Sequence, residues 1–160
     1  MSSTQDFFNA IRNGDLMTVS NLLTKDKTLL NSKDERGSTP LILATYYNQK
    51  EITQLLVKQG APLDATDGSG NTALLGVCFK GYVDLARLII EAGADVDHVN
   101  SMGATALIYA VTFNRLDIAE LLLSKGADVN KKDARGNTAL DQAKEQNNLA
   151  MIDLLEAAQG

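Results

Sequence analysis

Four glycines recur along the chain at intervals of 33 residues, and the residues around them recur at the same interval. The glycines are Gly37, Gly70, Gly103 and Gly136. Each is followed two positions later by a threonine, and two positions after that by a leucine. A period that holds to the residue along so much of the chain indicates tandem copies of one small unit. We therefore expect the chain to fold as an array of such units.

The segment 67–99 shows how one unit is expected to fold. Residues 67–71 contain two glycines and three small polar residues, a composition typical of a turn. Thr72 then stands where a helix N-cap belongs. We predict a short inner helix that runs to about Lys80 and an outer helix over about 83–91, which carries one apolar face.

The apolar positions of the predicted outer helix recur in the other units. They are Ile52, Leu55 and Leu56, then Leu85, Leu88 and Ile89, then Ile118, Leu121 and Leu122, then Met151, Leu154 and Leu155. A single helix pair cannot bury such a face, but stacked neighbours share a continuous core. Stacking is therefore the expected source of stability.

The repeated unit resembles the ankyrin repeat. The second unit contains the motif Thr-Pro-Leu at 39–41, and the fourth ends with Gly-Ala-Asp-Val-Asn at 126–130, the closing motif of that family in full. The resemblance implies an all-α solenoid of stacked helix-turn-helix repeats with projecting β-turn fingers. It covers nearly the whole chain as one domain, 1–160, with a degenerate first copy and these approximate units: 1–33, 34–66, 67–99, 100–132 and 133–160.

The sequence departs from the family pattern at two motif positions. The motif proline occurs only as Pro40, and the motif histidine is replaced by Ile42, Leu75, Ile108 and Asp141. In the family, that imidazole ties neighbouring turns together by hydrogen bonds. We therefore expect apolar packing to contribute more of the contact between the repeats of this chain.

The charge and the cysteine content exclude several classes of function. A net charge of −5 disfavours binding to nucleic acid, which needs a basic stripe, and to anionic membranes. A single cysteine, Cys78, cannot support a disulfide framework. The first 15 residues lack the pattern of a signal peptide. No apolar run is nearly as long as the stretch of about 18 residues that is needed to span a bilayer. We expect a cytoplasmic protein.

The resemblance implies that a partner protein would meet the fingers and the concave face lined by the inner helices. The finger residues expected to be exposed are Glu35, Arg36, Ser38, Gly68, Ser69, Asn71, Ser101, Met102, Ala104, Ala134, Arg135 and Asn137. The corresponding residues at the ends of the inner helices are Arg12, Asn13, Tyr46, Tyr47, Phe79, Lys80, Thr112, Phe113, Glu145 and Gln146. The candidate partner-binding residues taken from these sets are Tyr46, Tyr47, Phe79, Lys80, Thr112, Phe113, Arg12, Glu35, Arg36, Ser69, Met102 and Arg135.

Aromatic residues are concentrated at the ends of the inner helices. The chain has four tyrosines, four phenylalanines and no tryptophan, yet Tyr46, Tyr47, Phe79 and Phe113 all fall on positions that the family leaves in solvent. In consecutive repeats these rings would form one stripe, and exposed aromatic residues are typical anchors of protein interfaces. The alternative is that the rings pack along the helices and shield the core. Tyr109 is expected to line the core.

No catalytic or metal-binding constellation is evident in the sequence. His98 is the only histidine, so neither a triad nor a two-histidine metal site can form, and we expect an exposed loop residue. Cys78 occupies a small position between helices and is expected to be a buried, inert thiol. Asp34, Asp67 and Asp133 recur with the period of the array and are expected to form turns rather than a catalytic pair. No metal and no cofactor is expected.

Three hypotheses for the function follow. The first is a protein–protein interaction module without enzymatic activity, which acts as a small adaptor or as an inhibitory or regulatory subunit, monomeric on its own. The second is an enzyme or small-ligand-binding protein with a cryptic acidic site. The third is a stretch of a larger scaffold, against which the atypical end copies and the starting methionine argue. The sequence favours the first.

Overall fold

The computed structural model describes residues 3–159, and over that range the chain consists of helices joined by turns. The helices are α1 (Ser3–Asn13), α2 (Leu16–Lys25), α3 (Pro40–Tyr46), α4 (Lys50–Lys58), α5 (Ala73–Lys80), α6 (Val83–Glu91), α7 (Ala106–Thr112), α8 (Leu116–Ser124), α9 (Ala139–Glu145) and α10 (Leu149–Gln159), with the 3₁₀-helix η1 (Lys27–Asn31) after α2. The bounds predicted for α5 and α6 are confirmed.

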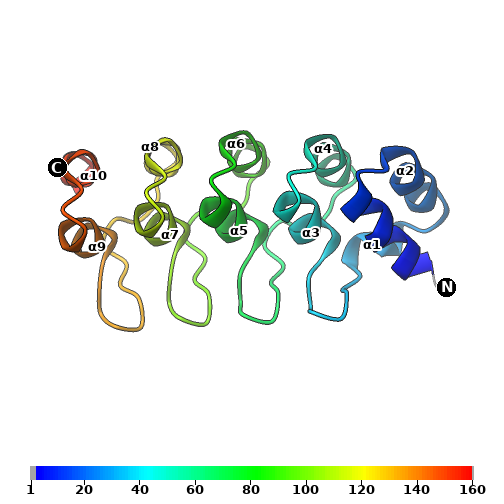
Figure 1. The fold of residues 1–160 in the computed structure, drawn as a ribbon, viewed down its shortest axis with the longest axis horizontal. Helices are drawn as coiled ribbons and strands as arrows, with labels where there is room; N and C mark the ends of the chain where they lie inside the picture. The colour runs from blue at the N-terminus through cyan, green and yellow to red at the C-terminus, as the bar shows by residue number, and fades with distance from the viewer. Residues whose placement is uncertain (1–2, 160) are drawn as a thin grey trace.

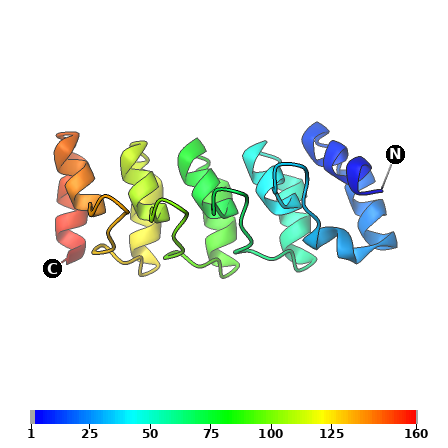
Figure 2. The same ribbon diagram turned by 90° about the horizontal axis from the view of Figure 1, so that it is seen from below.

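The helices form two layers that run along the molecule (Figure 1). The inner helices α1, α3, α5, α7 and α9 make one layer, and the outer helices α2, α4, α6, α8 and α10 make the other. The turns that precede α3, α5, α7 and α9 project from the same side of the stack (Figures 1 and 2). This arrangement confirms the prediction of an all-α solenoid of helix-turn-helix repeats with projecting fingers.

Threonine side chains start four of the inner helices. Thr39, Thr72, Thr105 and Thr138 are the N-caps of α3, α5, α7 and α9, and each hydroxyl accepts a hydrogen bond from the backbone N–H three residues later. Such a cap satisfies a donor that the helix itself leaves free. Pro40 follows Thr39 at the first helical position, where the missing N–H has no partner to lose.

The inner helices end in a left-handed residue that turns the chain into the outer helix. Gly81 has this conformation after α5, with φ of 81°. At the matching place after α3, α7 and α9 the chain uses Asn48, Asn114 and Asn147, with φ between 55° and 57°. Asparagine tolerates this conformation better than most residues because its short polar side chain can form local hydrogen bonds. Glycine and asparagine therefore give the same backbone turn at this position of the repeat.

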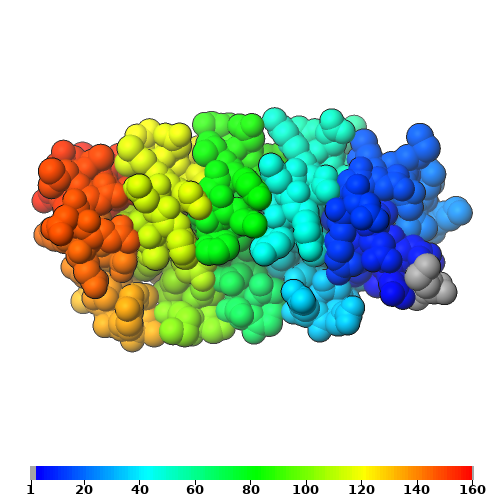
Figure 3. Space-filling model, viewed as in Figure 1, coloured from blue at the N-terminus to red at the C-terminus, as the bar shows by residue number. Residues whose placement is uncertain are grey.

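One hydrophobic core runs through the repeats and is built from apolar side chains of both the inner and the outer helices. The fully buried side chains of the central repeats include Ile52, Leu56, Leu85, Ile89, Ile118 and Leu122. Neighbouring repeats are in contact along the length of the molecule (Figure 3). Since each repeat covers the apolar face of the next, the core side chains are buried only when the repeats are stacked.

Each projecting turn is held by the side chain of its first residue. Asp34, Asp67 and Asp133 each accept hydrogen bonds on Oδ1 from the N–H groups two and four residues later. The amide oxygen of Asn100 does the same for Met102 and Ala104. The prediction that the recurring aspartates form turns is confirmed.

Hydrogen bonds, and not apolar packing alone, connect neighbouring turns. Ser101 donates its N–H to the carbonyl of Ser69 at 3.1 Å, and Ala134 donates to the carbonyl of Met102 at 2.9 Å. The side-chain amide of Asn100 also donates to Oδ1 of Asn71 at 2.9 Å. The expectation that apolar packing would take over from the absent motif histidine was therefore incomplete, because backbone groups and asparagine side chains supply polar contacts between the turns.

Candidate functional site

Three aromatic side chains are exposed at the ends of neighbouring inner helices. The relative exposure is 48% for Tyr46, 46% for Tyr47 and 44% for Phe79. The family pattern places this end of the inner helices in solvent, and the prediction of exposure is confirmed for these three residues. They are attached at helix ends: Tyr46 ends α3, Tyr47 is its C-cap, and Phe79 lies in the last turn of α5.

Four other residues that were expected to be exposed are half-buried, namely Arg12, Lys80, Thr112 and Phe113. The ring of Phe113 stands edge-on to Phe79, with the ring centres 4.7 Å apart, and edge-on to Tyr109 at 5.6 Å. The expectation that Phe113 is exposed is therefore wrong. Its place in the sequence shows which helix end it occupies, but not that a ring from the preceding repeat stands against it.

Lys80 connects the two groups of rings. Its Nζ lies 4.4 Å from the centre of the Tyr46 ring on the preceding repeat, a distance at which an ammonium is attracted to the ring face. Tyr46 in turn stands edge-on to Tyr47, with centres 5.3 Å apart. The aromatic row, defined as Tyr46, Tyr47, Phe79, Lys80, Tyr109 and Phe113, is thus continuous across α3, α5 and α7.

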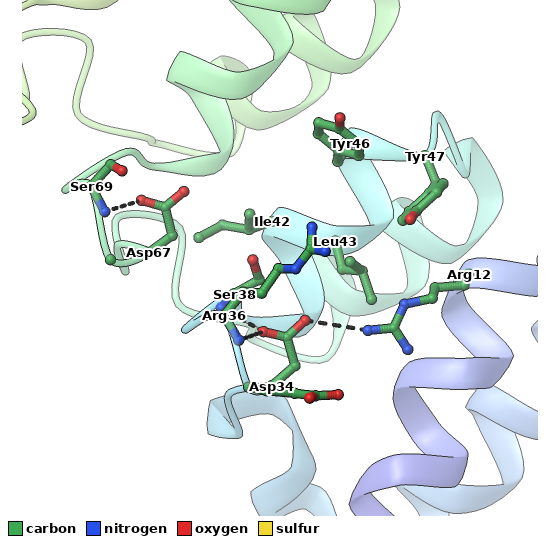
Figure 4. A pocket seen from close by; sticks show the side chains of 12 residues that line it. Arg12, Asp34, Arg36, Ser38, Ile42, Leu43, Tyr46, Tyr47, Asp67 and Ser69 are labelled. Atoms are coloured by element: carbon green, nitrogen blue, oxygen red, sulfur yellow. Dashed lines mark hydrogen bonds and ion pairs between the residues drawn. The ribbon is translucent and has the colours of Figure 1, made fainter.

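A cavity of about 490 Å³ lies beside the aromatic row, between the first two fingers and the helices α1 and α3 (Figure 4). It brings together six residues predicted for partner binding: Arg12, Glu35, Arg36, Tyr46, Tyr47 and Ser69. The remaining lining residues, which were not among the candidate partner-binding residues, are Asp34, Ser38, Ile42, Leu43, Asp67 and Gly68. The period identified Asp34 and Asp67 as turn residues, but it could not show the space between the two turns.

The two arginines of this cavity differ in their partners. Arg12 Nη2 lies 3.4 Å from Oδ2 of Asp34, whose carboxylate is also used by the turn (Figure 4). Arg36 extends from the first finger toward α3 (Figure 4) and forms no ion pair with any residue of the described range. The carboxylate of Asp34 pairs with Arg12, so the cavity retains one guanidinium without a carboxylate partner among residues 3–159.

The other predicted finger residues mostly lie where they were expected. Met102 is 64% exposed, Ser69 is exposed, and Arg135 is exposed with Nη2 3.7 Å from Oδ2 of Asp133. Ala104 was expected to be exposed, but it is buried and donates its N–H to Oδ1 of Asn100. The expectation of exposure is also wrong for Ser38, Asn71 and Asn137, which are half-buried. The fingers that carry Met102 and Arg135 lie outside the lining of the cavity, so the structure does not gather all the predicted residues into one hollow.

His98 is not the exposed loop residue that the sequence suggested. It is half-buried, and its Nε2 lies 3.1 Å from the carbonyl oxygen of Gly70 on the preceding finger. The sequence could not show this contact, because the matching loop positions hold unrelated residues. Within residues 3–159 no group of three or more His, Cys, Asp or Glu side chains could hold a metal ion. The same range contains no helix long and apolar enough to cross a membrane.

Cys78 is fully buried between the helices, as predicted. Burial raises the pKa of its thiol well above the ordinary value, because the thiolate would lose its hydration. A neutral, inaccessible thiol is a poor nucleophile and a poor metal ligand. The side chain therefore belongs to the core.

The geometry defines a helical-repeat protein with an exposed aromatic row and projecting fingers. The family model for ankyrin repeats (3 copies) matches the chain over residues 7–100, 60–133 and 99–159. The chain belongs to the ankyrin-repeat family. Ankyrin repeats are protein–protein interaction modules and are typically not enzymes. No curated protein sequence matches the chain.

Proposed function

We propose that this protein is a small adaptor or an inhibitory or regulatory subunit that binds a partner protein through the inner-helix face and the fingers. The observation that supports this most is the exposure of Tyr46, Tyr47 and Phe79 on consecutive inner helices. Large rings lose favourable burial when they remain in water, and they are enriched among the residues that contribute most to binding at protein interfaces.

The contacts within the aromatic row favour a binding role over simple shielding of the core. The edge-on contacts between Tyr46 and Tyr47 and between Phe79 and Phe113 restrict the rings, so less conformational entropy is lost when a partner covers them. The cavity beside Tyr46 and Tyr47 adds a concave surface with polar groups at its rim. A partner could insert one side chain there and lie across the rings.

The proposed action is occlusion or recruitment of the partner, without chemistry of its own. We propose further that the array 1–160 acts as a single domain, that it is monomeric in the absence of its partner, and that it works in the cytoplasm. The net charge of −5 supports a protein partner over nucleic acid or an anionic membrane. No observation favours the alternative of a cryptic acidic site for a small ligand.

The proposal is tested by affinity capture from native lysate with the wild-type protein and with matched variants. Tyr46→Ala and Phe79→Ala remove exposed rings of the aromatic row. Leu149→Ala and Met17→Ala remove side chains that are more exposed but lie on outer helices. We expect one captured protein to be lost or weakened with the first two variants and retained with the last two.

Melting temperatures separate binding from folding in this experiment. Tyr46→Ala is expected to change the melting temperature little, whereas Phe79→Ala should lower it modestly, because it also removes the ring contact with Phe113. Both variants should remain folded and weaken binding by about 1–3 kcal/mol. Equal capture by all four variants would contradict the proposed surface. A loss of capture that follows a loss of stability would favour the view that the rings only shield the core.

A further inference from the structure

Gly76 lies in the middle of α5 (Ala73–Lys80) and is partly exposed, on the inner-helix face that also carries Phe79 and that is called the groove below. The matching residues of the neighbouring repeats are Leu43 and Tyr109. Glycine inside a helix is destabilising relative to alanine, because it has more backbone freedom to lose on folding. A glycine at this position therefore needs a reason.

The structure provides no reason for Gly76 within the chain itself. It does not have a positive φ, so its backbone conformation is open to any residue. A Cβ built on Gly76 would meet no heavy atom within 4 Å, so no neighbour excludes a side chain. Gly70 and Gly103 differ, since a Cβ there would lie 3.0 Å and 2.9 Å from a backbone nitrogen of the next finger.

The absent side chain leaves a notch on the groove face of α5. Phe79 and Lys80 follow three and four residues later and therefore lie on the same side of the helix. Leu43 and Tyr109 occupy the corresponding positions of α3 and α7, the helices packed against α5. The notch thus lies between larger side chains and next to the exposed ring of Phe79.

Lys80 gives this part of the groove a positive charge. It is the one charged residue within the inner helices α3, α5 and α7 as the structure bounds them. It forms no ion pair with any residue of the described range, and its ammonium lies over the Tyr46 ring. In a chain with a net charge of −5, an unpaired cation on an otherwise uncharged helical surface favours a carboxylate from outside.

We infer that the groove binds a segment of a partner protein that places a large apolar side chain in the notch at Gly76 and an aspartate or glutamate on Lys80. This inference rests on the proposed function and specifies the chemistry of the partner. Because Gly76 has no side chain, the partner segment can approach α5 closely between Phe79 and Tyr109. The charge of Lys80 fixes the direction in which the segment lies. Gly76 lowers the stability of the helix, and in this proposal that loss is offset by contacts that form only in the complex.

The test uses a display library of random 16-residue peptides, selected on the wild-type protein. Binding of the enriched peptides is then measured for Gly76→Leu, which fills the notch, and for Lys80→Glu, which reverses its charge. The matched controls are Gln54→Leu and Lys58→Glu, the same kinds of change at exposed positions of the outer helix α4. Thermal unfolding checks that each variant is folded.

The enriched peptides are expected to share a large apolar residue and a nearby carboxylate. Gly76→Leu and Lys80→Glu should each weaken their binding by about tenfold or more, while the two controls leave it unchanged. Selection on Lys80→Glu should enrich basic residues in place of acidic ones. Gly76→Ala should melt at or above the wild-type temperature, since no fold requirement holds the glycine.

Three results would overturn the inference. They are the absence of any enriched peptide, enriched peptides that bind Gly76→Leu and Lys80→Glu as tightly as the wild type, and loss of folding in Gly76→Leu. Peptides whose binding is unchanged by Gly76→Leu and Lys80→Glu but lost with Tyr46→Ala or Phe79→Ala would leave the proposed function intact. Peptides whose binding is unchanged by substitution at all four positions would contradict both this inference and the proposed function.

Discussion

The ring of Phe79 stands edge-on against the ring of Phe113, with the ring centres 4.7 Å apart and the planes at 86°. Phe79 lies on α5, and Phe113 is the C-cap of α7 in the next repeat. The contact therefore connects the exposed groove with the junction between two repeats. A residue of the candidate binding surface is in this way also part of the packing that holds the array together.

The Phe79–Phe113 contact should be measurable as an energetic coupling. We expect a double-mutant cycle with Phe79→Leu and Phe113→Leu to give a coupling of about 0.5–1.5 kcal/mol in the free energy of unfolding, since edge-on ring pairs contribute that much beyond their buried area. Denaturant titration of the four proteins provides the measurement. Tyr47 and Phe113 share no ring contact, so the equivalent cycle between them should be additive; a similar coupling there would contradict this account.

Leu122→Ala is expected to destabilise the protein by about 2–5 kcal/mol. Leu122 is fully buried in α8, at the centre of the core shared by the stacked repeats, and its truncation leaves a cavity that the neighbours cannot close. Urea titration followed by circular dichroism measures the loss. Leu149→Ala, at an exposed position of α10, serves as the control and should change stability by less than about 0.5 kcal/mol. A loss of less than about 1 kcal/mol in the free energy of unfolding of Leu122→Ala would refute the packing described.

Asn100→Ala is expected to cost about 1–3 kcal/mol, because it leaves buried polar groups without partners. The Asn100 amide oxygen accepts from two backbone N–H groups of its own turn, and its nitrogen donates to Asn71 and to the hydroxyl of Tyr109. Asn100→Asp keeps the acceptor oxygen and loses the donor. Asn100→Asp should therefore be more stable than Asn100→Ala, and thermal unfolding of both variants tests this. Identical losses of stability in the two variants would show that the hydrogen bonds within the turn contribute nothing.

Cys78 should stay unreactive toward a thiol reagent until the protein unfolds. Burial raises the pKa of the Cys78 thiol above its ordinary value of about 8.5, so the folded state disfavours the thiolate. A raised pKa in the folded state means that this contribution to stability is complete below the unfolded pKa and is lost as the pH rises above it. Stability measured between about pH 8 and 10 should fall more for the wild type than for Cys78→Val. Rapid modification of the folded protein at neutral pH would contradict the burial.

Much of the fold followed from the sequence, because the period repeats the same local instructions. The threonines before α3, α5, α7 and α9 and the aspartates of the turns act on backbone groups a few residues away. Interactions of such short range are fixed by spacing along the chain. For the same reason the approximate bounds predicted for α5 and α6 agree with the structure.

The candidate surface was predictable only in outline. The position of a residue within the repeat indicated which helix end it occupies, and this was sufficient for Tyr46, Tyr47 and Phe79. It failed for Phe113 and His98, whose exposure depends on groups 28 residues or more away along the chain: the Phe79 ring and the Gly70 carbonyl. No local pattern encodes the side chain that a neighbouring repeat will place against a given residue.

The sequence by itself determined the repeat, the helix pairs and the turns, since each depends on contacts within one unit of 33 residues. The tertiary structure alone decided how the rings meet across repeats, where Lys80 rests, and that the space beside Gly76 is empty. These features arise from the distances between units. Such distances are set by the packing of the whole stack, in which every side chain at a junction affects the next.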